Sequence, residues 1–415
     1  MNIILIAIPF FFLLIALEII TDKIRKTQYY RLNDAISSLT LGIVSRATDI
    51  AKKFVPFTLY VLFVEHISIV QLPDSLWVWV LAFVMYDFCY YWTHRMSHEI
   101  NVLWAAHVVH HSSEEYNLTT ALRQTSGGFL TWIFYIPMAL IGIPWEIFLA
   151  VGALNLVYQF WVHTRHVPKL GWYELIFVTP SNHRVHHAQN EVYIDRNYGG
   201  VFILWDRMFG TFQEELEDEP CIYGIRKPLA SWNPIWANLH FYWQLMKDAW
   251  RTDSWKDKFR IWFKPTGWRP ADMEIKDPIV PADLSKFKKF DIEITGWQKC
   301  YALLQHLILI VAALTVMMNL ASYSNAQIVA GVVFTIYASI SLSLVLSNAR
   351  WFKAAEFIKH GGFIALMQVL GAAPWLSQIA LGLVVLSLLV LVVTMKQSID
   401  KQIENSSGVN PTANQ

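Results

Sequence analysis

Charged residues are scarce in this chain. Asp, Glu, Lys and Arg account for 16% of its 415 residues, whereas hydrophobic residues account for 55%; a typical soluble domain carries roughly 25% charged residues. We therefore expect an integral membrane protein rather than a water-soluble globular one. The 33 basic residues are balanced by 32 acidic ones, so no excess of positive charge marks a surface for nucleic acid, and we expect no nucleic acid partner.

Cysteine is also rare. Cys89, Cys221 and Cys300 lie far apart and form no CxxC pair, which argues against a disulfide framework and against a thiolate metal site. We interpret all three as ordinary apolar residues.

Long apolar runs are abundant by contrast. Residues 1–20 contain only Asn2 and Glu18 as polar residues, and about 20 apolar residues cross one bilayer. No basic segment precedes this run and no small-residue cleavage site follows it, so we expect a first anchor and not a cleaved signal peptide. The basic residues that follow directly place this loop in the cytosol by the positive-inside rule; they are Lys23, Arg25, Lys26 and Arg31.

Further apolar runs predict an all-α integral membrane protein, a multi-span helical bundle with a cytosolic, histidine-rich di-metal cap. The expected spans after the first lie at about 54–70, 77–92, 300–320, 328–346 and 376–393, with a weak segment at 357–372. We divide the chain into N-terminal membrane anchor helices (1–75), a catalytic core (76–215), a cytosolic cap extension (216–298), C-terminal membrane helices (299–395) and a disordered tail (396–415).

The apolar block 129–162 is interrupted by Gly142-Ile143-Pro144. Each half is short for a full span, so we expect a hairpin that enters and leaves the membrane on the same face. Such a hairpin returns His163 to the face on which the earlier histidines lie.

Histidine is concentrated in one region. Ten of the fourteen histidines lie between His94 and His187, in one HxxxH pattern and two HxxHH patterns. Residues three and four apart share a face of a helix, so each pattern presents its imidazoles together. The expected metal ligands are the eight histidines of these patterns and His163: His94, His98, His107, His110, His111, His163, His183, His186 and His187. The isolated His66, His240, His306 and His360 are interpreted as structural or surface residues.

Nine imidazoles exceed what one four-coordinate zinc ion requires, so the pattern favours two metal ions. Ligand type alone leaves iron and zinc open. A metal-bound histidine usually donates its other N–H to a carboxylate or carbonyl oxygen. We expect Asp87 and Asp195 in that role, with Glu99, Glu114 and Glu115 as further candidates and His166 as a second supporting residue or a surface residue.

The motifs resemble those of the fatty acid hydroxylase and sterol desaturase superfamily, and within it they look most like the alkylglycerol monooxygenase family. The matching runs are Tyr91-Trp-Thr-His-Arg-Met-Ser-His98, the run from His110 to Gln124, Tyr158-Gln-Phe-Trp-Val-His-Thr164, and Thr179-Pro-Ser-Asn-His-Arg-Val-His-His187 with the segment up to Thr211. The additional C-terminal membrane block is also similar in kind to that family.

The resemblance implies a di-iron centre that uses O2 to hydroxylate the carbon next to the ether oxygen of an alkylglycerol lipid, which then releases a fatty aldehyde. It also implies tetrahydrobiopterin as an electron donor, a lipid substrate drawn from the bilayer, and Glu114, Tyr116 and Asn117 as active-site residues. The site is expected to face the cytosol, at the endoplasmic reticulum in a eukaryote or the cytoplasmic membrane in a bacterium.

Two alternatives remain open at this point. Another lipid hydroxylase or desaturase of the same superfamily would act on a sterol, sphingolipid or aminolipid chain. A metal transporter or metal-storing membrane protein would place ligands near the middle of the membrane, whereas these histidines lie at the ends of the expected spans.

Overall fold

A computed structural model describes residues 3–52 and 54–407 of the chain. These described residues are helical, with isolated β-bridges and no β-strand. They separate into two compact units, one made of residues 1–230 and 235–290 and the other of residues 231–234 and 291–415. The all-helical class expected from the sequence is confirmed, whereas the finer division into five segments stays a prediction.

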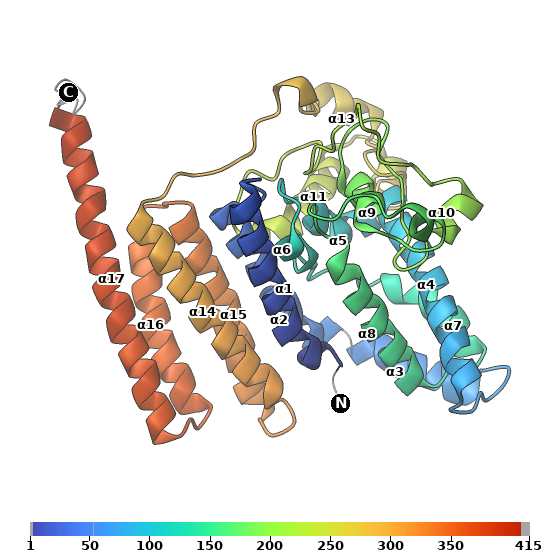
Figure 1. Ribbon diagram of the computed structural model, residues 1–415, viewed down its shortest axis with the longest axis horizontal. Helices are drawn as coiled ribbons and strands as arrows, with labels where there is room; N and C mark the ends of the chain where they lie inside the picture. Colours follow the sequence, from blue (N-terminus) through green and yellow to red (C-terminus); the bar gives the residue numbers. More distant parts are fainter. Residues whose placement is uncertain (1–2, 53, 408–415) are drawn as a thin grey trace. The chain divides into compact units, whose positions relative to one another are not determined.

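The first unit contains helices α1 to α13 (Figure 1). Their bounds are α1 Ile3–Arg25, α2 Leu32–Lys52, α3 Phe54–His66, α4 Leu76–Glu99, α5 Asn101–His111, α6 Leu118–Ala121, α7 Ile136–Leu140, α8 Trp145–Trp161, α9 Pro180–His187, α10 Leu204–Phe209, α11 Pro234–Arg251, α12 Trp255–Arg260 and α13 Ala271–Lys276. Two 3-10 helices, Thr131–Tyr135 and Gly171–Leu175, lie between them, and a third, Leu284–Lys286, follows α13.

Helices α4 and α8 pack side by side and, with α3 and α7, enclose an apolar core (Figure 1). The block 129–162 turns back at Gly142, whose φ of 80° is in the left-handed region that favours glycine. A side chain there would also meet the carbonyl oxygen of Val70, because a Cβ atom would lie 1.8 Å from it. This turn lets α8 run back toward the end of α4 that carries the histidines.

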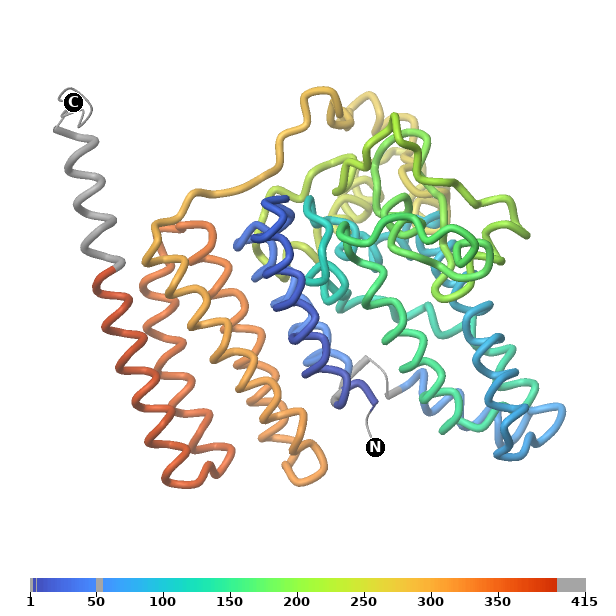
Figure 2. Tube along the Cα trace, viewed as in Figure 1, coloured from blue at the N-terminus to red at the C-terminus, as the bar shows by residue number. Residues whose placement is uncertain are grey.

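The second unit is a bundle of four long helices, α14 Gly296–Met318, α15 Asn325–Leu346, α16 Phe352–Val369 and α17 Pro374–Ser407 (Figure 2). Capping boxes at Thr295 and Ser324 fix the starts of α14 and α15. Among the fully described helices, α14, α15 and the part of α17 up to Val393 are long and apolar enough to cross a membrane.

The sequence left open whether the weak segment 357–372 crosses the membrane. It lies within and just beyond α16, which carries three charged residues and is not among the candidate spans of the described residues. The tail was expected to be disordered from residue 396, but α17 continues to Ser407; the remaining residues, 408–415, lie outside the described part of the chain.

Candidate metal centre

Helices α4 and α5 meet at a sharp corner that brings their histidines face to face. Ile100 between them is extended, and the Asn101 side chain holds the corner by donating to the carbonyl oxygens of Ile261 and Trp268. His94 and His98 of α4 therefore face His107 and His111 of α5.

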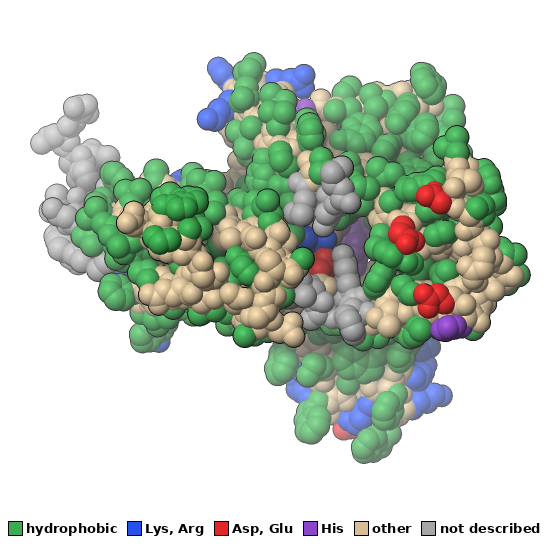
Figure 3. Space-filling model, turned by 90° about the horizontal axis from the view of Figure 1, so that it is seen from below, with side chains coloured by type: hydrophobic (Ala, Val, Ile, Leu, Met, Phe, Trp, Pro, Cys, Tyr) green, Lys and Arg blue, Asp and Glu red, His purple; other side chains and the backbone are tan. Residues whose placement is uncertain are grey.

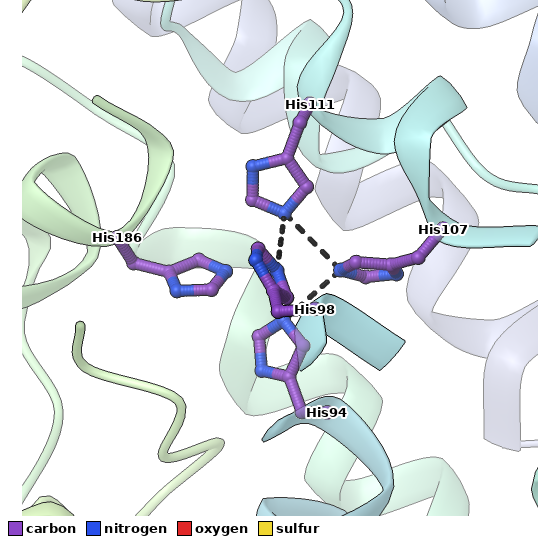
Figure 4. Close-up of side chains that lie close together, drawn as sticks. All are labelled: His94, His98, His107, His111 and His186. Carbon is purple, nitrogen blue, oxygen red and sulfur yellow. Dashed lines mark hydrogen bonds between the residues drawn. The ribbon is translucent and has the colours of Figure 1, made fainter. Parts of the chain in front are cut away.

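Five histidines form the first group (Figure 4): His94, His98, His107, His111 and His186. Their ligand atoms all lie within 4.8 Å of one another. The Nε2 atom of His94 is 3.1 Å from that of His107, and the Nε2 atom of His98 is 3.1 Å from that of His111. The rings thus converge on one point from α4, α5 and α9.

Four histidines form the second group: His110, His163, His183 and His187. Here the Nε2 atom of His163 lies 3.1 Å from that of His183 and 3.4 Å from that of His110. Helix α9 is only eight residues long, but a capping box between Thr179 and Asn182 stabilises its start.

The two groups are neighbours. The rings of His111 and His187, one from each group, stack with their centroids 4.3 Å apart. Two ions held by these groups would therefore lie close together, as in enzymes that use a metal pair.

Backbone carbonyl groups orient four of the rings. The Nδ1 atom of His94 lies 2.8 Å from the Tyr198 carbonyl oxygen, and that of His110 lies 3.0 Å from the Arg123 carbonyl oxygen. The Nδ1 atom of His163 lies 2.8 Å from the Gln159 carbonyl oxygen, and that of His186 lies 2.9 Å from the Arg196 carbonyl oxygen. Since a carbonyl oxygen only accepts, each Nδ1 atom carries the proton and each Nε2 atom presents a lone pair. This is the usual arrangement of a metal-binding histidine.

These lone pairs fit a cation. His110 and His163 direct unprotonated Nε2 atoms at each other across 3.4 Å, which is repulsive unless a positive charge lies between them. The Nε2 atoms of His186 and His187 are buried without a hydrogen-bond partner among the described residues. Buried polar atoms are seldom left unsatisfied, and neutral imidazole is a good ligand for iron, zinc and copper.

Burial also keeps these histidines neutral. Loss of solvent lowers the pKa of His107, His111 and His187 well below the usual value, and neighbouring histidines lower it further. Burial lowers the pKa of His110 to about 4. Neutral imidazoles can bind a metal at physiological pH without first releasing a proton.

Asp87 was expected to accept a hydrogen bond from a metal-binding histidine, but its partners are different. The carboxylate accepts hydrogen bonds from the backbone N–H groups of Val201 and Phe202 and from the side chains of Trp205 and Asn155. These four donors satisfy it, so Asp87 ties α4 to the loop before α10 instead of holding a histidine ring.

The other two supporting residues differ from each other. The Asp195 carboxylate lies 3.7 Å from the Nδ1 atom of His98, too far for a direct hydrogen bond, so its role in orienting that ring stays a prediction. His166 lies outside both groups, and its ring packs 5.0 Å from that of Tyr29. Among the described contacts, none joins the His166 ring to the nine histidines.

The three residues expected in the active site have different surroundings. Tyr116 borders the second group, with its ring 5.3 Å from that of His187, and its hydroxyl donates to the Val162 carbonyl oxygen. Burial raises the pKa of Tyr116 far above the usual value, so the hydroxyl stays protonated.

Glu114 and Asn117 are engaged elsewhere. Glu114 accepts a hydrogen bond from the backbone N–H of Phe290. The Asn117 side chain accepts from the backbone N–H of Thr119 and thereby caps α6. For Asn117 this corrects the expected role, because its side chain stabilises a helix start.

Sequence reasoning missed the carbonyl groups that orient the rings and the side chains that hold those carbonyls. Asp206 accepts from the backbone N–H groups of Tyr198 and Gly199, and so fixes the Tyr198 carbonyl against His94. Arg123 is fully buried and donates to the Val109 carbonyl oxygen and the Ser112 hydroxyl near the end of α5. A backbone carbonyl group cannot be recognised from the sequence. A charged residue inside a motif, such as Arg123, can be recognised as a candidate for a buried supporting role.

The fatty acid hydroxylase family model matches residues 79–211, the segment that contains all nine histidines. No solved structure matches the chain significantly.

Several curated proteins are similar over most of the chain. Alkylglycerol monooxygenase of Xenopus tropicalis is 40% identical over 307 residues, which are 73% of this chain and 68% of that protein. The enzymes of the same name from Homo sapiens and Danio rerio are each 38% identical, over 82% and 81% of this chain and 77% and 75% of their own lengths.

Proposed function

The chain belongs to the alkylglycerol monooxygenase family of the fatty acid hydroxylase superfamily, and on that premise we propose that it cleaves the ether bond of alkylglycerol lipids at two histidine-bound iron ions. That it is a membrane lipid monooxygenase follows from the family and from the candidate membrane spans. The proposal adds the substrate, the ligands, the electron donor and the side of the membrane.

The observation that carries the proposal is the pairing of two histidine groups with inward lone pairs. We assign the first group of five and the second group of four as ligands of one iron each. Iron is assigned because the reaction is a redox reaction, and zinc has no redox chemistry.

The overall reaction balances with one O2 and a two-electron donor. One oxygen atom enters the C–H bond next to the ether oxygen, and the other is released as water with two protons and two electrons. The product is a hemiacetal, whose C–O bond breaks to give a fatty aldehyde and the free glycerol hydroxyl. We assign tetrahydrobiopterin as the donor, as the family resemblance implies.

The iron ions would supply the activation of O2 for insertion into the C–H bond. The protein's own part is to hold and shield them. Carbonyl groups fix four of the rings, and all nine histidines lie out of solvent or nearly so. Exclusion of water protects a reactive oxidant until it meets the lipid carbon. The hydroxyl of Tyr116 stays protonated beside the second group.

We also propose that the site faces the cytosol. The basic residues Lys23 and Arg25 end α1, and the Arg25 side chain donates to the His166 carbonyl oxygen, three residues beyond His163. This contact supports the proposal, because it joins the segment after His163 to the end of α1 that the positive-inside rule assigns to the cytosol.

The test is an assay on purified membranes that contain the chain. Labelled alkylglycerol with tetrahydrobiopterin should release fatty aldehyde, and the His66→Ala variant should do so equally because His66 is exposed and isolated. No aldehyde, but a hydroxylated sterol or acyl chain with another donor, would contradict ether cleavage while leaving the monooxygenase intact.

A further inference from the structure

The exposed face of helix α11 is apolar. Leu239, Trp243, Met246 and Trp250 follow one another at intervals of four, three and four residues and are all exposed, with Trp243 57% and Trp250 85% accessible. Such spacing places them on one face of the helix. The opposite face is buried and includes Leu245 and Asp248, so the outer face of this helix is apolar where a polar face is usual.

Three more exposed aromatic side chains follow on α12 and just beyond its end. Trp255, Phe259 and Phe263 are spaced four residues apart and are 74%, 69% and 72% accessible. We call these residues together the aromatic face: Leu239, Trp243, Met246, Trp250, Trp255, Phe259 and Phe263. A soluble protein seldom exposes a continuous surface of this kind unless it binds something there.

Basic residues flank the aromatic face. Residues 234–264 contain six basic residues and three acidic ones; Lys247 and Arg251 pair with Asp277, and Arg260 pairs with Asp257. The basic residues are Lys247, Arg251, Lys256, Lys258, Arg260 and Lys264. In Figure 3, the lobe that projects at the bottom of the view carries hydrophobic side chains beside both basic and acidic ones.

The aromatic face is rigidly attached to the helix that carries three of the histidines. Leu245 of α11 and Ile261 pack with Ala105 of α5 in one buried cluster. The segment after α12 is also fixed at the corner between α4 and α5, because Asn101 donates to the Ile261 carbonyl oxygen at 2.9 Å and its backbone N–H donates to the Lys264 carbonyl oxygen at 3.0 Å.

We propose that the aromatic face lies in the headgroup region of the bilayer and sets the depth at which the histidine-bearing helix α5 is held. Tryptophan favours the interface between lipid and water over both water and the hydrocarbon interior. A helix with Trp, Phe and Leu on one face and flanking Lys and Arg is typical of elements that lie in the membrane plane, and anionic headgroups complement the positive charge. This inference goes beyond the proposed reaction and does not depend on its substrate.

The test places a fluorescent bimane label on single cysteines at Trp250 and at Phe259, in a full-length chain whose Cys89, Cys221 and Cys300 are replaced by Ala. The matched control carries the label at Asp218, an exposed position in the polar loop before α11. Each labelled chain is placed in nanodiscs that hold one chain, with ordinary or brominated phospholipids. Its thermal unfolding is compared with that of the unlabelled chain, and only labelled chains that unfold at the same temperature are used.

We expect brominated lipids to quench the labels at positions 250 and 259 but not the label at position 218, and iodide in the buffer to quench only the last. Labels at both test positions that are quenched by iodide and not by lipid would overturn the proposal, because the face would then lie in water. Labels shielded from both quenchers would overturn it as well, since another part of the chain would cover the face.

Discussion

The two units of this protein both bury polar side chains but satisfy them differently. At the histidine groups of the first unit, lone pairs point at one another and two buried Nε2 atoms have no partner among the described residues. In the bundle of the second unit, Glu356 is fully buried and accepts from Tyr301, Ser341 and Lys359.

The network of the second unit continues without a break. Lys359 also donates to the Gln305 side-chain oxygen at 2.8 Å, and the Gln305 side-chain nitrogen donates to the Ser387 hydroxyl at 2.9 Å. Donors meet acceptors at each step. A network of this kind needs no ion to complete it, whereas the lone pairs of the histidine groups fit one.

The difference between these two clusters shows how a metal site can be distinguished from a polar cluster with a structural role. Both are buried and both contain ionisable residues, so burial and charge do not distinguish them. The direction of the lone pairs does, because donor and acceptor roles match in the Glu356 network and conflict in the two histidine groups.

The largest expected effect is loss of turnover in the His110→Ala variant. This change removes one of the four histidines of the second group, and loss even of a residue that supports a ligand commonly costs about 10–100-fold in metal affinity or activity. We expect fatty aldehyde release to fall by more than about 100-fold. The His66→Ala variant is the control; equal losses in both variants would show that the effect is not specific to the metal centre.

The next largest effect is on stability, in the Glu356→Ala variant. It leaves the Lys359 ammonium buried without its carboxylate, which typically costs about 3–5 kcal/mol of unfolding free energy. Thermal and denaturant unfolding in detergent should show this loss, while the metal content per folded chain stays unchanged. Adding Lys359→Met should recover much of the stability. A double variant as unstable as the single one would contradict the assignment of the pair.

A third effect concerns the pH dependence of stability at Asp206. Burial raises the pKa of this carboxyl from its usual 3.8 to about 6. The folded state therefore binds the proton more tightly than the unfolded state, and this group lowers the unfolding free energy by about 3 kcal/mol as the pH rises from about 4 to about 7.

The Asp206→Asn variant has no carboxyl group that titrates at this position. The unfolding free energy of the unmodified chain minus that of the variant should therefore fall as the pH rises across this interval. Denaturant unfolding at several pH values measures the difference. A constant difference would show that Asp206 ionises normally in the folded protein.

The smallest effect is expected for Asp195→Asn. The carboxylate lies 3.7 Å from His98 Nδ1 and its side chain is about half exposed, so its influence on the ring is weakened by solvent. Asparagine also tolerates the backbone at this position, where φ is 58°. We expect metal affinity to fall by about tenfold at most, measured by competition with a chelator, with Asp218→Asn as the unchanged control.

The sequence predicted which histidines lie together, because their spacing is local. HxxxH and HxxHH depend only on helix periodicity, and all nine histidines fall into the two groups of the structure. The position of His163 beside the others followed from the turn at Gly142. That these nine residues bind metal stays a prediction.

What failed depended on contacts distant in sequence. The partners of Asp87 include Phe202 and Trp205, more than one hundred residues away, and no local pattern announces them. Asn117 is different, since Asn117 followed by Thr120 is a capping pattern that could have been recognised. The apolar outer face of α11 was not recognised either, because exposure becomes visible only after folding; that this segment belongs to a cytosolic cap stays a prediction.

The central claim is that the nine histidines hold two iron ions that oxidise lipid. The most direct measurement is elemental analysis of the purified, active chain together with its turnover of labelled alkylglycerol. The account predicts about two irons per chain, one for each histidine group, and aldehyde release that disappears with the iron and returns when iron is added back. Full turnover by a chain that contains only zinc, or no metal, would contradict it.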